Sequence, residues 1–148
     1  MTTMKKLLQY GAARGITIHA ARLEPGIFGE WYEEEREIYF DLTLSPDEQL
    51  EAICHEFGHA HHGHRCENNP DAERQADIFA ARMLIDPAKY ALLERTGMSR
   101  HDIADELGLS VRILDVFLKH CLTMMRGVTY ARARMGAGQW LHRADVAS

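Results

Sequence analysis

The chain has 148 residues, of which 46% are hydrophobic, enough to build one modest core. Its 22 acidic and 17 basic residues give a formal net charge of -5 at neutral pH, which disfavours nucleic acid and anionic membranes as partners. No apolar run is long enough to span a membrane, so a membrane protein is excluded.

The cellular compartment can be predicted from the cysteines and the N-terminus. Three cysteines are an odd and sparse set, unlike the paired cysteines of a small secreted scaffold. Lys5 and Lys6 are followed by only two leucines before polar residues return, so no export signal is visible. We therefore expect a cytoplasmic protein with reduced thiols.

The N-terminal part of the chain predicts a short helix and then a small sheet. The helix is expected from about Thr3 to Ala13. Three β-prone stretches follow it, at residues 16–18, 27–32 and 37–44. Pro25-Gly26 and the acidic run at residues 33–35 provide turns between them. Such short connections favour a mostly antiparallel sheet.

A strong helix-start signal follows at Ser45-Pro46-Asp47-Glu48. Ser45 can cap the helix, Pro46 suits its first position, and Glu48 completes a capping box. The helix continues as an apolar stripe with the spacing i, i+3, i+4, i+7, made of Leu50, Ile53, Cys54 and Phe57. We expect it to end near His62, and a second helix to run from about Asp71 to Ile85.

The C-terminal part predicts two further helices within residues 99–120, in the outline of a helix-turn-helix. The second of these helices is apolar on most sides and offers only Arg112 and Lys119 as strong donors to phosphates or bases. We therefore favour packing, with DNA binding and protein docking as alternatives. One domain is expected over residues 1–127, followed by a loosely ordered tail rich in Arg, Ala and Gly at residues 128–148.

The sequence His55-Glu56-Phe57-Gly58-His59 places an HExxH motif inside the first of the long predicted helices. Residues i and i+4 share one helix face, so His55 and His59 can bind one tetrahedral zinc ion while Glu56 borders its open position. Zinc so bound lowers the pKa of water toward about 7 and polarises a peptide carbonyl. Glu56 can accept a proton from that water and pass it to the leaving amine. The motif predicts a zinc peptidase.

The second long helix offers a third ligand, Glu73. On a helical wheel this carboxylate shares a side with residues that should face the interior, namely Ala76, Ala80 and Leu84. A buried carboxylate needs a partner, and zinc is suitable, although an ordinary salt bridge is the alternative. Asp77 can accept a hydrogen bond from the outer nitrogen of His55 or His59 and fix the ligating tautomer, unless it is merely exposed or ion-paired.

More potential ligands follow the motif and raise the hypothesis of a second metal: His61, His62, His64 and Cys66. We favour ordinary roles for them, because one continuous helix points His61 and His62 away from the zinc face and Gly63 then ends the regular geometry. His62 and His64 stay candidates to reach the cleft or a substrate. Candidates to stabilise a tetrahedral oxyanion are Tyr90, His101 and Tyr130.

In this order the motifs resemble the ImmA/IrrE-type metallo-endopeptidases of bacteria and mobile elements. Residues 73–87 are similar to that family's Glu-x-x-Ala-(Asn/Asp)-x-Phe-Ala-Ala-x-Leu-Leu-x-Pro pattern, and residues 103–110 to its helix-turn-helix-like segment. The resemblance covers about residues 16–120. It implies an α+β, zincin-like domain whose small sheet packs on the HExxH helix.

The resemblance also implies residue roles and a substrate. By it, His55, His59 and Glu73 are zinc ligands and Glu56 is the catalytic base; manganese or iron would fit the same ligands. Members of the family typically cleave transcriptional repressors of mobile elements or stress responses, so we expect a helix-turn-helix repressor as substrate. The alternatives are a non-catalytic zinc protein that binds a regulator, against which Glu56 argues, and a DNA-binding regulator that uses residues 99–120.

Overall fold

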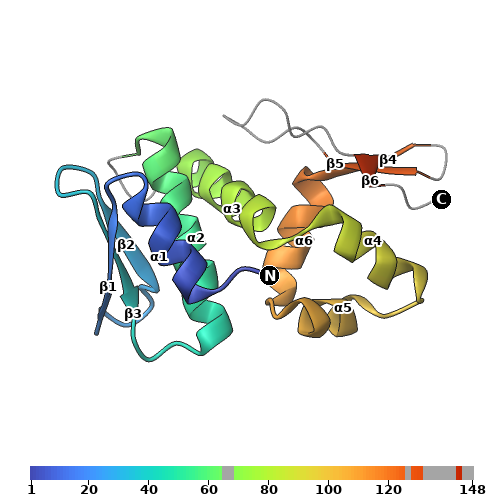
Figure 1. Cartoon of the computed structure of the whole chain (residues 1–148), viewed down its shortest axis with the longest axis horizontal. Coiled ribbons are helices and arrows are strands. Elements are labelled where there is room, and N and C mark those ends of the chain that lie inside the picture. The colour runs from blue at the N-terminus through green and yellow to red at the C-terminus, as the bar shows by residue number, and fades with distance from the viewer. Residues whose placement is uncertain (65–68, 126–127, 132–142, 145–148) are drawn as a thin grey trace. The chain divides into compact units, whose positions relative to one another are not determined.

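The computed structural model describes residues 1–64, 69–125, 128–131 and 143–144 (Figure 1). Contacts divide the chain into two compact units, Met1–Leu84 and Ile85–Ser148. The fold is α+β, as predicted. Among the described residues, no helix combines the length and the apolar character needed to cross a membrane. The predicted domain boundary at residue 127 stays a prediction.

The first unit contains three helices and a three-stranded sheet in its described part. The elements are α1 (Met4–Ala12), β1 (Thr17–Ala21), β2 (Gly29–Tyr32), β3 (Glu37–Asp41), α2 (Pro46–His62) and α3 (Pro70–Leu84). Each of them overlaps the stretch that the sequence predicted. The helix α3 begins at Pro70 because Asn69 caps it: the Asn69 side chain accepts hydrogen bonds from the backbone N–H groups of Asp71 and Ala72.

The sheet is mixed rather than mostly antiparallel, which corrects the sequence-based expectation. Its strand order is β1-β3-β2, with β1 parallel and β2 antiparallel to the central β3. The tight β2–β3 hairpin is antiparallel, as short connections require. The longer segment between β1 and β2 leaves a gap of one strand between them. The next strand, β3, fills this gap and runs parallel to β1.

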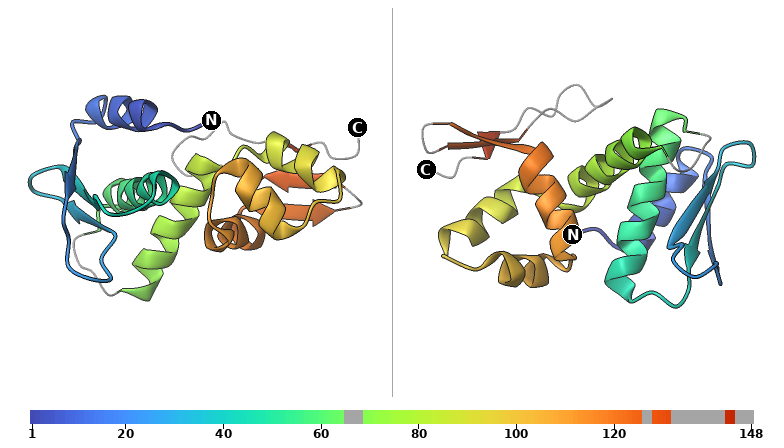
Figure 2. Two further views of the ribbon diagram at one scale, coloured as in Figure 1. Left: turned by 90° about the horizontal axis from the view of Figure 1, so that it is seen from below. Right: turned by 180° about the vertical axis from the view of Figure 1, so that it is seen from behind.

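The helix α2 lies between the sheet and α3 (Figures 1 and 2). Its buried stripe includes Ile53 and Phe57, and Ile38 of β3 is equally inaccessible. Tyr10 of α1 meets the Phe57 ring edge-on at 4.8 Å between centroids. Each such large apolar side chain contributes about 1.5–3 kcal/mol on burial. The helix that carries HExxH is therefore held from both sides.

The start of α2 has the predicted capping box. The Ser45 Oγ accepts a hydrogen bond from the Glu48 backbone N–H at 3.3 Å, and the Glu48 carboxylate accepts one from the Ser45 N–H at 3.0 Å. Gly63 ends the helix in the left-handed conformation, with φ of 69°. Both ends of α2 were thus readable from local sequence.

The close packing of α2 on α3 depends on Gly58. A Cβ atom at this position would lie 2.7 Å from the Ala76 Cα and 2.9 Å from the Ala76 carbonyl oxygen. Ala76 and Ala80 are themselves fully buried on the facing side of α3. Small residues on both helices therefore bring the backbones together and place the polar residues of α3 beside those of α2.

In its described part, the second unit contains three helices and three antiparallel strands in the order β4-β5-β6. The elements are α4 (Pro87–Arg95), α5 (Arg100–Leu107), α6 (Val111–His120), β4 (Leu122–Met125), β5 (Val128–Ala131) and β6 (Arg143–Ala144). The two predicted helices within residues 99–120 are present. Residues 132–142 and 145–148 of the predicted tail lie outside the described residues.

Helix α4 and the second sheet were not predicted. Asp86-Pro87 ends the predicted helix pattern, but it also starts a new helix: the Asp86 side chain accepts a hydrogen bond from the Ala88 N–H at 3.0 Å, and Pro87 occupies the first helical turn. The apolar face of α6 is buried, and its Phe117 ring packs on Tyr90 of α4 at 5.8 Å between centroids. This burial fits the favoured packing role of α6.

Candidate metal centre

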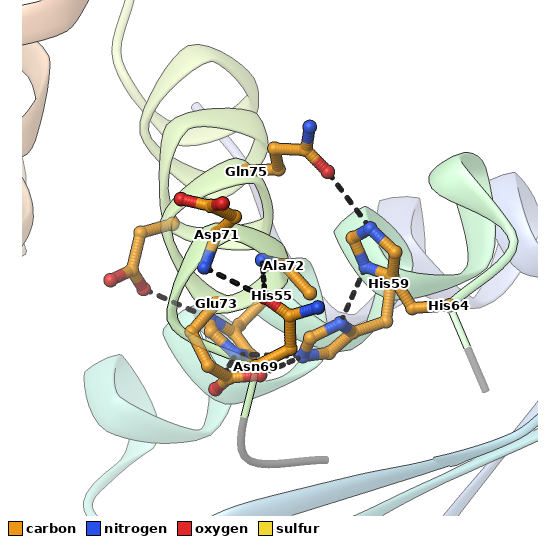
Figure 3. A network of polar contacts seen from close by, with 9 residues as sticks. His55, His59, His64, Asn69, Asp71, Ala72, Glu73 and Gln75 are labelled. Carbon is orange, nitrogen blue, oxygen red and sulfur yellow. Dashed lines mark hydrogen bonds and ion pairs between the residues drawn. The ribbon is translucent and has the colours of Figure 1, made fainter. Parts of the chain in front are cut away.

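Two histidines and a glutamate converge where α2 faces α3 (Figure 3). His55 and His59 lie one turn apart on α2, and their Nε2 atoms are 3.1 Å from each other. The Glu73 carboxylate reaches from α3 and places one oxygen 3.1 Å from His55 Nε2 and the other 2.8 Å from His59 Nε2. Three side chains from two helices therefore direct their polar atoms to one point.

This donor set fits a metal ion. One ligand atom from each of His55, His59 and Glu73 lies within 4.8 Å of the others. Two imidazoles and one carboxylate are the protein ligands of many catalytic zinc sites, which keep a further position open. The side chain of Glu73 is 45% exposed, whereas those of His55 and His59 are 19% and 11% exposed, so the group is reachable from the Glu73 side.

Asp77 contacts the outer nitrogen of His55, on the side of the ring away from Glu73. Its carboxylate accepts a hydrogen bond from His55 Nδ1 at 2.9 Å, and it lies one turn after Glu73 on the same face of α3. Burial lowers the pKa of His55, but the hydrogen bond to Asp77 and the charges of Glu56, Asp77 and Glu73 outweigh it, so the pKa is raised overall. Of the two histidines that the sequence offered to Asp77, the structure selects His55.

His59 has a different partner, His64. Their Nδ1 atoms are 2.9 Å apart, and His64 Nε2 is 2.9 Å from the Gln75 Oε1 atom on α3. Burial and the charge of His55 lower the pKa of His59. Gln75 was missed by sequence reasoning, because no local pattern connects it to a residue eleven positions earlier.

Glu56 lies on α2 between the two histidines in sequence and is buried, with 6% of the residue exposed. It extends toward the edge strand β2, where a Cβ atom at Gly29 would lie 3.0 Å from both the Cγ and the Oε1 of Glu56. A larger residue at this position would require the Glu56 side chain to give by a few tenths of an ångström. Sequence reasoning also missed Gly29, which lies within the predicted β-prone stretch 27–32 and shows no local sign of contact with Glu56.

Comparison with known proteins agrees with this geometry. The family model of the IrrE N-terminal-like domain, a peptidase family, matches residues 12–119. The chain belongs to this family. No curated protein and no solved structure matches the chain.

Membership confirms the resemblance drawn from the motifs and makes this IrrE-like protein a peptidase of the metal-dependent ImmA/IrrE type. The group formed by His55, His59 and Glu73 is compatible with the metal that such an enzyme needs. The individual roles of these residues, of Glu56 and of Asp77 stay predictions.

The remaining histidines after the motif do not join this group. In the described part of the chain, the metal-compatible cluster contains neither His61 nor His62. The His61 ring contacts Phe79 at 5.0 Å between centroids, and the His62 ring stacks on His64 at 5.3 Å. His64, which the sequence left as a candidate to reach the cleft, contacts a member of the metal-compatible cluster.

The described cysteines and oxyanion candidates are not part of the metal-compatible group. Cys54 and Cys121 are buried thiols, and burial raises the pKa of the Cys54 thiol, which keeps it unreactive. The Tyr90 hydroxyl donates a hydrogen bond to Glu94 at 2.8 Å within α4, and His101 is exposed on α5. Cys66 and the side chain of Tyr130 lie outside the described part of the structure.

Proposed function

We propose that this IrrE-like protein is a zinc-dependent endopeptidase in which His55, His59 and Glu73 bind the metal and Glu56 is the general base. The observation that carries the proposal is the convergence of the three donor atoms beside a buried glutamate. When bound, zinc supplies Lewis acidity, which activates water and polarises a peptide carbonyl.

The protein residues then divide the remaining work. Glu56 accepts a proton from the attacking water and delivers it to the leaving amine, so one carboxyl group acts first as base and then as acid. Gly29 leaves space for that carboxylate beside β2. Asp77 accepts a hydrogen bond from the protonated Nδ1 of His55, which leaves the Nε2 lone pair of His55 available to the metal.

The proposed substrate is an exposed linker or helix of a helix-turn-helix transcriptional repressor that governs a mobile element or a stress response. Family resemblance supports this choice, and so does the small size of the chain, which leaves little room for an elaborate set of subsites. The net charge of -5 disfavours nucleic acid as the partner. The proposed location is the cytoplasm, where such repressors act.

The metal site is tested by measuring zinc content after dialysis. We expect one zinc ion per chain, and a sharp loss of occupancy in His55→Ala, His59→Ala and Glu73→Ala. His61→Ala is the matched control, since His61 is an exposed histidine outside the group. Full zinc retention by Glu73→Ala would remove Glu73 from the ligand set.

The reaction is tested by incubating the zinc-loaded protein with candidate repressors and identifying fragments by mass spectrometry. We expect one or a few defined cuts that Glu56→Gln does not make. A repressor that binds tightly but is never cut would contradict the peptidase proposal and favour the non-catalytic zinc protein.

A further inference from the structure

We propose that His64 and Gln75 form a relay that holds His59 in its metal-binding tautomer, as Asp77 does for His55. This inference rests on the proposed zinc site. His64 and Gln75 are positioning residues in this proposal, because they act through His59 and contact neither metal nor substrate.

The relay is a continuous chain of contacts, visible in Figure 3. Gln75 Oε1 lies 2.9 Å from His64 Nε2, and His64 Nδ1 lies 2.9 Å from His59 Nδ1. Two imidazole nitrogens at this distance share one proton: one donates it and the other accepts it. The outer nitrogen of His59, Nδ1, therefore has His64 as its partner, while the Nε2 atom of His59 faces His55 and Glu73.

The orientation of the Gln75 amide determines which nitrogen donates. In the arrangement of the structure its carbonyl oxygen faces His64 and can only accept, and the relay accordingly assigns the proton of neutral His64 to Nε2. His64 Nδ1 then has a free lone pair and accepts the proton of His59 Nδ1. His59 in turn keeps a lone pair on Nε2, which is the form that ligates a metal.

The opposite orientation would block the site. If the Gln75 amide nitrogen faced His64, it would donate to His64 Nε2 and leave the proton on His64 Nδ1. That proton would point to His59 Nδ1 and force the His59 proton onto Nε2, where no metal can then bind. The proposed relay therefore requires the orientation of the structure, in which the Gln75 carbonyl oxygen faces His64.

The fold keeps His64 in place after the end of α2. Gly63 adopts φ of 69°, and the His64 backbone N–H donates to the His59 carbonyl oxygen at 3.0 Å, so the chain turns back over the last turn of the helix. The ring of His62 stacks on that of His64, with 16° between the ring planes. The His64 side chain thereby links His59 of α2 to Gln75 of α3 beside the candidate metal site.

The first test measures the zinc dissociation constant by competition with a chromophoric chelator. We expect His64→Ala to weaken zinc binding about 10- to 100-fold, as is usual when the partner of a ligating histidine is lost. Gln75→Met, which keeps the size of the side chain and removes the acceptor, should also raise the zinc dissociation constant. His64→Asn should restore most of the affinity, because its Oδ1 can accept where Nδ1 did. His61→Ala should leave the constant unchanged.

The second test reads the tautomers directly, by long-range proton–nitrogen NMR of the zinc-loaded wild-type protein with labelled histidines. We expect the proton of His59 on Nδ1 and that of neutral His64 on Nε2. A proton on His64 Nδ1 would overturn the relay even if a His64 variant failed to fold.

The two proposals fail in distinguishable ways. If the wild type binds no zinc, or if His59→Ala binds it as tightly as the wild type, the proposed metal site is wrong. If His59→Ala loses zinc while His64→Ala and Gln75→Met match the His61→Ala control, only the relay is overturned. Circular dichroism of each variant checks that the helices are intact.

Discussion

At the scale of single residues, two properties of Glu56 support its proposed role as general base. It is buried beside β2, and it lies in the same HExxH motif as the two histidines of the metal-compatible group. We expect Glu56→Gln to keep zinc and fold but to reduce hydrolysis at least about a hundredfold, because the amide has the shape of the carboxyl group without its proton chemistry. Cleavage assays with equal zinc content measure this, and unchanged rates would exclude the mechanism.

Gly29 makes a separate prediction about the same carboxylate. In Gly29→Ala the new Cβ atom would lie 3.0 Å from Glu56 Cγ and Oε1. It would also lie 3.3 Å from the Tyr39 carbonyl oxygen, so the new methyl group is crowded by the backbone of β3 as well. The Glu56 side chain must give by a few tenths of an ångström, and displacing the proposed general base from its reacting position lowers the rate. We expect a loss of kcat with zinc affinity retained.

The control for this prediction is Glu30→Ala, which changes the neighbouring residue on the opposite face of β2. Full activity in Gly29→Ala, or an equal loss in both variants, would show that Gly29 has no special relation to Glu56.

At the scale of elements, the contact between α2 and α3 is the critical one. In Gly58→Ala the added methyl group would lie 2.7 Å from the Ala76 Cα, a backbone atom that cannot turn away. Helix propensity alone predicts that Gly→Ala stabilises a helix by up to about 1 kcal/mol. Overpacking predicts the reverse, a loss of about 1–3 kcal/mol. We expect urea unfolding to show the loss, together with weaker zinc binding; a gain in stability would refute tight packing.

The connection from β3 to α2 gives a prediction about pH. Hydrogen bonds from the Thr43 hydroxyl and backbone N–H, at 2.6 and 2.8 Å, and from the Leu23 N–H, at 3.2 Å, lower the pKa of Asp41 despite its burial. A carboxyl group whose pKa is lower in the folded state stabilises the protein above its unfolded pKa of about 3.9 and loses this effect as pH falls through the folded pKa.

We therefore expect Asp41→Asn to be less stable than the wild type at pH 7, with the difference shrinking as the pH is lowered below about 4. Urea unfolding of both proteins across this range is the measurement. A difference that is independent of pH would mean that the charge of Asp41 contributes nothing.

At the scale of the whole molecule, the prediction concerns selectivity. A general protease would be hazardous at the proposed cytoplasmic location, so we expect cleavage to be restricted to a particular substrate. We expect rapid cleavage of a folded helix-turn-helix repressor encoded beside this protein and negligible cleavage of casein. Rapid casein digestion with the repressor left intact would defeat the regulatory proposal and leave the peptidase assignment standing.

Local sequence determined most of the elements and identified the three residues of the metal-compatible group. Capping residues and apolar periodicity locate α2, and the i, i+4 spacing places His55 and His59 on one face, because these relations act within a few residues of the chain. Glu73 was also named from the sequence, by its place on the apolar side of a helix, although its side chain is 45% exposed and not buried as that argument assumed. Asp86-Pro87 was ambiguous, because the same residues that end one helix can cap the next.

Only the tertiary structure decided the relations between distant segments. The crossing of β3 between β1 and β2, the room that Gly29 leaves for Glu56, and the line from Gln75 through His64 to His59 all join residues from different elements. No local propensity encodes them, because each depends on the packing of α2 against the sheet and α3. The HExxH motif was enough to predict the chemistry of the candidate site. Which residues surround and orient its members depends on how the helices and strands pack.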